Sequence, residues 1–179
     1  EETEELFCKL QGHDQVEIES RGEKFRFSIQ RIFCEYGSFN NNPHQSPIIN
    51  LPGGEILIMP QNNTMNGTIQ ANIGYALGEK IINPKLEIVN NSIASFSADT
   101  NSQIIERAIS EGGKDGSRVA FVCMGTNYNM GLENIDISYK SKTKGFLSIF
   151  WGNNTSMGGD VSGNAEWIIL LEDVNVSYL

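Results

Sequence analysis

Hydrophobic and polar residues alternate along much of this chain of 179 residues, in short segments separated by turns. The clearest pair is residues 15–20 and 24–30, in which apolar side chains take every second position on either side of Gly22. Alternation with a period of two around a glycine turn is typical of a β-hairpin with one face in solvent. Segments of the same kind recur to the end of the chain, with turn residues between them.

The whole pattern indicates a single β-rich domain. Turn signals separate the segments about every ten residues, a spacing typical of antiparallel sandwiches. The sequence therefore predicts an all-β fold, an antiparallel β-sandwich or jelly roll with about nine or ten strands. We expect one domain over residues 1–179, with residues 1–6 as an acidic N-terminal extension. The further candidates for these strands are residues 48–51, 55–59, 68–77, 85–89, 92–98, 118–124, 134–140, 145–151 and 165–179.

One segment has the periodicity of a helix. Its apolar residues fall on one stripe of a helical wheel, and a pair of glycines follows where the helix would end. We therefore expect one short helix near residues 101–112. The order strand, helix, strand over residues 92–125 also allows a βαβ unit, but one such unit among many hairpins does not make a parallel α/β domain. The residues of the stripe are Ile104, Ile105, Ala108 and Ile109.

Residues 145–171 hold two apolar blocks around a stretch rich in Gly, Asn, Ser and Thr. Residues 167–171 are apolar on both faces, the signature of a central strand that is buried on both sides. Such a strand needs cover above and below, so we expect a helix, a loop or a neighbouring subunit over its second face. Beyond Glu172 the chain alternates again, which predicts an edge strand with one face in solvent.

The polar stretch between the two apolar blocks is a candidate ligand-binding loop. Trp151 stands at its start, and Asn153, Asn154 and Asp160 offer hydrogen-bonding groups. An aromatic face beside amide and carboxylate groups suits the recognition of sugars. The alternative is a surface hairpin loop with a core tryptophan at its base.

The charge balance bears on possible partners. The chain has a net charge of −9 and no cluster of Lys and Arg, so it repels phosphate backbones and we expect no nucleic-acid partner. No apolar run approaches the ~20 residues that cross a bilayer, so no membrane insertion is expected. We expect no cofactor; calcium is the one candidate ion, in the acidic loops at residues 99–101, 114–116 and 158–160.

Recognisable catalytic motifs are absent from the sequence. The two histidines, His13 and His44, lie in loop-like segments with no nucleophile motif around them. Glu166 and Glu172 share a strand face but stand ~20 Å apart at 3.3 Å per residue, too far for glycoside hydrolysis. We therefore expect a non-enzymatic protein and no metal site.

The cysteines leave one pairing open. The chain has three, Cys8, Cys34 and Cys123, so they cannot all pair within it. Cys123 lies in an apolar strand-like run and is expected to be a buried thiol. Cys8 and Cys34 flank the first hairpin, and a disulfide between them is possible.

The strand spacing, the segment "NGTIQANI" and the long loop before a Trp-bearing strand resemble the jelly-roll subunits of small virus coats. They resemble extracellular appendage subunits equally, and the resemblance implies no residue roles. The function expected first is therefore a structural subunit of an extracellular assembly: a virus coat, a pilus-like filament or an adhesin. Its partners would be copies of itself or homologous subunits, at an extracellular or virion surface. The alternatives are a carbohydrate-binding module using residues 151–160, and an acidic-pair glycoside hydrolase.

Overall fold

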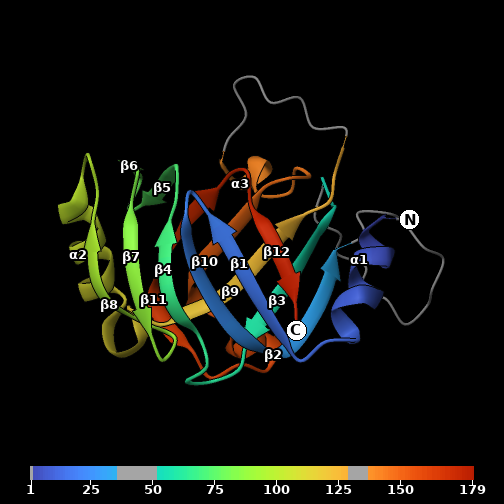
Figure 1. Cartoon of the computed structure of the whole chain (residues 1–179). Helices are drawn as coiled ribbons and strands as arrows, with labels where there is room; N and C mark the ends of the chain where they lie inside the picture. Colours follow the sequence, from blue (N-terminus) through green and yellow to red (C-terminus); the bar gives the residue numbers. More distant parts are fainter. Residues whose placement is uncertain (1, 36–51, 129–136) are drawn as a thin grey trace.

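Antiparallel strands make up most of the molecule (Figure 1). The computed structural model describes residues 2–35, 52–128 and 137–179. The predicted all-β antiparallel fold is confirmed, with twelve strands in the described ranges and a sheet curled into a half-barrel. The strands are β1 (Gln15–Ser20), β2 (Glu23–Glu35), β3 (Glu55–Pro60), β4 (Asn66–Gln70), β5 (Ile73–Ala76), β6 (Glu79–Ile82), β7 (Lys85–Val89), β8 (Ser92–Ser97), β9 (Val119–Gly125), β10 (Leu147–Asn153), β11 (Ser162–Leu171) and β12 (Asn175–Tyr178).

The long strand β2 joins the two walls of the half-barrel. Its first half pairs with β1 and β4, and its second half pairs with β3. One wall therefore has the order β12–β1–β2–β4–β7–β8, and the other has the order β2–β3–β9–β10–β11–β5–β6. The predicted hairpin of β1 and β2 is confirmed, and its register sets Glu17 opposite Arg26 and Glu19 opposite Lys24.

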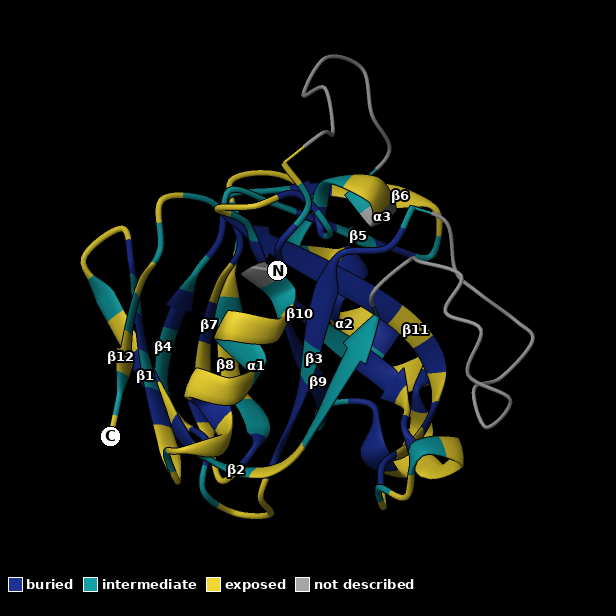
Figure 2. Ribbon diagram, turned by 90° about the vertical axis from the view of Figure 1, so that its right-hand side faces the viewer, coloured by how far each residue is buried: buried dark blue, intermediate teal, exposed yellow. Residues whose placement is uncertain are grey.

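The main hydrophobic core fills the inside of the half-barrel. Every second side chain of both walls points inward, and Figure 2 shows the central strands as buried almost throughout. Burying each large apolar side chain contributes about 1.5–3 kcal/mol relative to its exposure. Examples from the two walls are Ile18, Phe25, Ile58, Ile149 and Ile169, all at most 2% exposed.

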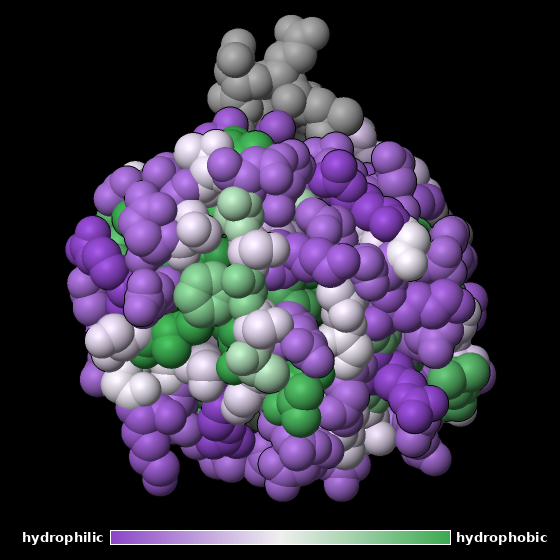
Figure 3. All heavy atoms as spheres, turned by 60° about the vertical axis from the view of Figure 1, so that its left-hand side comes forward, coloured by the Kyte–Doolittle hydropathy of each residue, from purple (hydrophilic) through white to green (hydrophobic). Residues whose placement is uncertain are grey.

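Helix α2 (Ser102–Glu111) confirms the predicted helix. It buries Ile104, Ile105 and Ala108, and packs against β5, β6, β8 and β11, at the side where the two walls do not pair. Figure 3 brings this side forward and shows apolar side chains gathered within a mostly hydrophilic face. The partly buried apolar residues of β8 and α2 include Ile93, Phe96 and Ile109.

The N-terminal segment is folded, which corrects the extension predicted for residues 1–6. Helix α1 spans Glu2–Gln11 and packs on β2 and β3. Leu10 is fully buried, and the Oγ1 atoms of Thr3 and Thr126 lie 2.7 Å apart in a hydrogen bond. The expectation failed because the acidic run "EETEE" opens an amphipathic helix whose apolar residues, Leu6, Phe7 and Leu10, come only after it.

Two predicted strands have a different form in the structure. The segment 68–77 divides at Ala71 and Asn72 into β4 and β5, which lie in opposite walls. Part of the segment 134–140 is the short helix α3 (Ile137–Lys140), and residues 134–136 lie outside the described ranges, as does the strand expected at 48–51.

The C-terminal segment divides as the sequence predicts. Strand β11 lies between β10 and β5 and is buried on both faces over residues 167–171. The chain then turns at Asp173, whose φ is 53°, and β12 pairs with β1 alone. The second half of the segment is therefore an edge strand, as expected.

Candidate functional site

The outer face of the second wall is also apolar. Side chains alternate along a strand, so the neighbours of the inward residues point outward. Phe121, Phe150 and Ile168 stand opposite one another on β9, β10 and β11 and form one row. A second row, one pleat away, runs through Leu57, Cys123, Ser148 and Leu170. The residues of these rows on β3, β9 and β10 that are apolar, Leu57, Phe121, Cys123 and Phe150, belong to a hydrophobic cluster separate from the main core.

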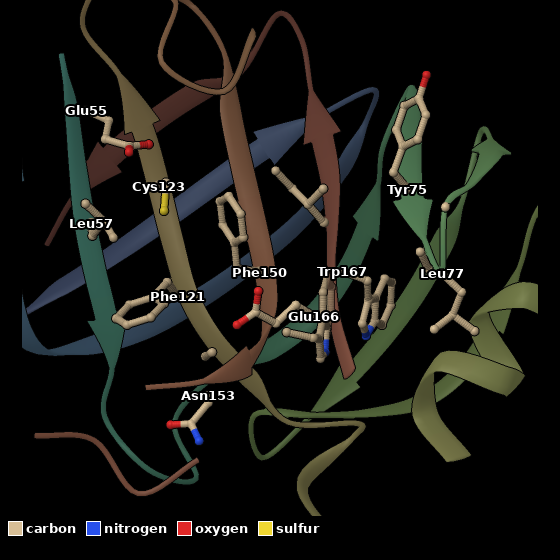
Figure 4. A pocket seen from close by; sticks show the side chains of 15 residues that line it. Glu55, Leu57, Tyr75, Leu77, Phe121, Cys123, Phe150, Asn153, Glu166 and Trp167 are labelled. Atoms are coloured by element: carbon tan, nitrogen blue, oxygen red, sulfur yellow. The ribbon is translucent and has the colours of Figure 1, made fainter. Parts of the chain in front are cut away.

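A cavity of about 660 Å³ lies over these rows. Figure 4 shows Phe121, Phe150 and Glu166 projecting from the sheet, with Glu55 at one end and Tyr75 and Leu77 at another. Its volume falls in the range of small-molecule sites, roughly 300–1,000 Å³. The lining residues are Glu55, Leu57, Tyr75, Ala76, Leu77, Gly78, Ala120, Phe121, Cys123, Phe150, Trp151, Asn153, Glu166, Trp167 and Ile168.

A cluster of three charges stands at the Glu55 end of the cavity. The Lys142 ammonium lies 2.8 Å from Glu35 Oε2 and 2.8 Å from Glu55 Oε1. The side chains of Lys142 and Glu55 are only 13% and 9% exposed, so solvent screens these contacts weakly. Two carboxylates against one ammonium leave a formal charge of −1 in the cluster.

Burial shifts the protonation of this cluster. It raises the pKa of Glu55 above its ordinary value; Lys142 opposes that rise and Glu35 adds to it. Burial alone would lower the pKa of Lys142, but its bonds to the two carboxylates raise it. The ammonium therefore stays charged at neutral pH.

The floor beside this cluster carries a thiol and a hydroxyl. Burial and the charge of Glu55 raise the pKa of Cys123 well above its ordinary value, so the thiol stays protonated at neutral pH. Ser148, opposite Cys123 on β10, is fully buried, and a hydrogen bond between the two side chains opposes the rise in the pKa of the thiol. Because Ser148 and Phe150 are two residues apart, Ser148 points to the face on which the cavity lies.

The predicted loop residues separate into two groups. Trp151 and Asn153 line the cavity, whereas Asn154 and Asp160 do not. Trp151 is 1% exposed, stacks on Trp167 at 4.0 Å between ring centroids, and donates from Nε1 to Ser117 O at 3.1 Å. It is therefore a core residue at the base of the loop, the alternative that the sequence left open.

Asn154 and Asp160 hold the loop in place. Asn154 is buried, donates from Nδ2 to Ala120 O at 3.1 Å, and accepts from Val161 N at 2.9 Å. The carboxylate of Asp160 accepts from Arg118 Nη2 at 3.1 and 3.2 Å, and from Asn62 Nδ2 at 2.8 Å. Their hydrogen-bonding groups are thus engaged within the protein.

Arg118 links this loop to the chain that follows α2. Its Nη1 lies 3.2 Å from Asp115 Oδ1, and Asp115 Oδ2 accepts from both N and Oγ of Ser162, at 3.0 and 2.9 Å. Burial alone would raise the pKa of Asp115, but the bonds from Ser162 and Arg118 lower it. The pKa of Asp160 is lowered in the same way, because the hydrogen bonds from Asn62 and Arg118 outweigh the effect of burial.

No disulfide joins Cys8, which is exposed, to Cys34, which is half-buried. Cys123 is buried as expected.

Within the described ranges, no group of three or more His, Cys, Asp and Glu residues is arranged to hold a metal ion. None of the helices in the described part of the chain is long and apolar enough to span a membrane.

Sequence reasoning missed the Glu55 end of the cavity. Glu35, Glu55 and Lys142 lie on separate segments, and only the pairing of β2 with β3 brings the two carboxylates together. The one available signal is a charged residue at the start of the apolar segment "EILIM", where Glu55 begins the strand. That signal is weak, since charged residues often flank buried strands.

No family model and no curated protein matches the sequence. Two solved structures share the fold over nearly the whole chain. Wild-type AmpT from Thermus thermophilus has a TM-score of 0.73 and 14% identity, over 97% of this chain and 48% of AmpT. A 2,5-dihydroxypyridine dioxygenase from Pseudomonas putida KT2440 has a TM-score of 0.77 and 16% identity, over 96% of this chain and 53% of the dioxygenase. This chain thus spans about half the length of either protein, and the likeness is one of fold.

These comparisons overturn the expected structural subunit of an extracellular assembly. The expectation rested on an architectural resemblance to coat and appendage subunits, and the fold is instead shared with AmpT and a dioxygenase. The carbohydrate-binding loop is not supported either, because Trp151 is buried and Asp160 is paired with Arg118. For the acidic-pair hydrolase, the two carboxylates that the fold brings together, Glu35 and Glu55, both bind Lys142.

Proposed function

We propose that this chain is a ligand-binding domain whose outer cavity takes a small molecule with an apolar, aromatic-sized body. The observation that carries the proposal is the cavity of about 660 Å³ over the rows of Phe121, Phe150 and Ile168, with polar groups at its ends. An apolar floor with a few convergent polar groups is the usual form of a small-molecule site.

The outer rows support binding because they are poorly explained by folding alone. The main core already occupies the inside of the half-barrel, so the fold does not need a second apolar face. Phe150 and Leu57 remain only half-buried at the cavity, although aromatic and aliphatic surface favours burial by about 25 cal/mol per Å². A bound apolar group would remove that surface from water.

The test is a titration with N-phenyl-1-naphthylamine, a neutral probe at pH 7 whose fluorescence rises in apolar surroundings. We expect saturable binding of one probe per chain, with a dissociation constant below about 1 mM. This limit corresponds to a binding free energy of about −4 kcal/mol. Leu57→Trp and Leu77→Trp enlarge half-buried side chains at two sides of the cavity and should each weaken binding at least tenfold.

The matched control is Ile93→Trp, which enlarges a half-buried apolar residue on β8, outside the cavity. It should bind the probe as the parent chain does. Thermal unfolding of all three variants checks that each is folded. Binding that survives both cavity variants, or that falls equally in the control, would contradict the proposal.

A further inference from the structure

The edges of the sheet differ in how the fold covers them. In the described part of the chain, β6, β8 and β12 each pair with a strand on one side alone. Residues around α2 bond to the open sides of the first two: Ile82 N on β6 donates to Thr100 O at 3.3 Å, and Ile93 N on β8 donates to Ser117 O at 3.0 Å. The open side of β12 has no such contact among the described residues.

The backbone bonds of β12 show which of its groups point to that open side. Leu179 and Gln15 exchange both of their N–H···O bonds, at 2.9 and 3.1 Å. Bonded pairs alternate along antiparallel strands, so Ser177 also bonds to β1. The N–H and C=O groups of Val176 and Tyr178 therefore point away from β1, where the described residues offer them no partner.

We propose that β12 pairs with β12 of a second copy of this chain, antiparallel about a two-fold axis at Ser177. This register sets Val176 of each copy opposite Tyr178 of the other, so the outward N–H and C=O groups of the two copies meet one another. An axis at Val176 would instead set Tyr178 opposite Val174, which lies outside β12. One and the same surface of each copy forms the contact, as a two-fold interface requires.

The side chains of β12 also suit a second copy. Val176 and Tyr178 are half-buried and pack against the main core, and the pairing would bury both further against each other. Although the chain has a net charge of −9, β12 holds no charged residue, so this register sets no like charges directly opposite. It also holds no Lys or Pro, the residues that commonly guard an edge. Figure 2 shows β12 as the outermost strand of its wall.

The experiment is sedimentation equilibrium of the full chain at pH 7, from about 10 µM to about 1 mM. Because β12 has only four residues, we expect a weak dimer, with a dissociation constant below about 1 mM. Ser177 is exposed, so its side chain can be changed without disturbing the core. Ser177→Glu and Ser177→Lys should each weaken the dimer at least about tenfold, because like charges meet at the axis.

An equimolar mixture of Ser177→Glu and Ser177→Lys should restore association, since opposite charges then meet at the axis. The matched control is Ser97→Glu, which adds the same charge at an exposed position on β8 and should dimerise as the parent chain does. Thermal unfolding checks that each variant is folded.

Three results would overturn the inference: a monomer at about 1 mM, a dimer that Ser177→Glu leaves unchanged, or a mixture that associates no better than either variant alone. A dimer that Leu57→Trp weakens instead would place the contact at the cavity and contradict the inference as well. Since β12 lies apart from the residues that line the cavity, the loss of this inference would leave the proposed ligand site untouched.

Discussion

Single polar residues in this protein serve either the fold or the cavity, and their type alone does not separate the two. Asn153, the last residue of β10, and Asp160, in the loop that follows, are both polar, but Asn153 lines the cavity and Asp160 pairs with Arg118. The two residues differ in role because the fold places Arg118 next to Asp160. Of the four residues that the sequence singled out, Trp151 and Asn153 line the cavity, and contacts between distant segments decide the roles of the other two.

Asp115 is the residue whose loss should destabilise the fold most in this region. Its side chain is 7% exposed, and it binds Arg118 and both N and Oγ of Ser162. Asp115→Ala leaves these donors and the Arg118 charge without their acceptor, so we expect a loss of about 2–4 kcal/mol in the free energy of unfolding. Urea denaturation measures the loss, with Glu106→Gln as the control; a change below about 0.5 kcal/mol would contradict this account.

The same carboxylate should make the protein sensitive to acid. The pKa values of Asp115 and Asp160 are lowered in the folded state, so their contribution to stability is present above the ordinary value of 3.8. It is lost as the pH falls below that value through the folded pKa. We therefore expect the stability of the parent chain to fall more steeply between pH 4 and pH 2.5 than that of Asp115→Ala, in denaturation series across this range. Parallel pH profiles would refute the assignment.

At the scale of elements, the sequence predicted those strands and helices whose formation depends on residues close together in the chain. The β1–β2 hairpin and α2 were predictable because each has a complete periodic signal within one segment. The division of residues 68–77 into β4 and β5 was not, since the alternation runs through Ala71 and Asn72 without a glycine or proline. Only pairing with β7 on one side and β11 on the other separates the two strands.

The two halves of the C-terminal segment should differ in local stability. Strand β11 is hydrogen-bonded on both sides, by β10 and β5, whereas β12 is bonded by β1 alone. Edge strands open with a smaller free energy than central ones. Amides of residues 166–171 should therefore exchange with deuterium at least about 100-fold more slowly than those of 175–178, in exchange experiments read by mass spectrometry. Equal protection of the two segments would show that β12 is held by more than β1.

At the scale of the whole molecule, one β half-barrel presents two apolar faces with different uses. The inner face builds the main core, and the outer face of β9, β10 and β11 forms the floor of the cavity. The sequence predicted that residues 167–171 need cover on both sides, and that prediction holds at Ile168 and Leu170. What it could not predict is that the cover is incomplete, because a cavity depends on the volumes of side chains from strands far apart in sequence.

Ligand binding should stabilise the folded chain as a whole. A ligand that binds only the folded state at 100 times its dissociation constant adds about 2.7 kcal/mol to the free energy of unfolding. We expect N-phenyl-1-naphthylamine at that concentration to raise the thermal midpoint of the parent chain by a few degrees, and that of Leu57→Trp by less. The same rise in both proteins would place binding outside the cavity.

The most direct test of the central claim, that the outer cavity is the ligand site, is methyl NMR during a titration with N-phenyl-1-naphthylamine. We predict chemical-shift changes at the methyl groups of Leu57, Leu77 and Ile168, which line the cavity, because the naphthalene ring current acts on its nearest neighbours. The methyl groups of Ile93 and Ile109, on β8 and α2, should not move. Shifts confined to Ile93 and Ile109, or no shifts at saturating ligand, would contradict the account.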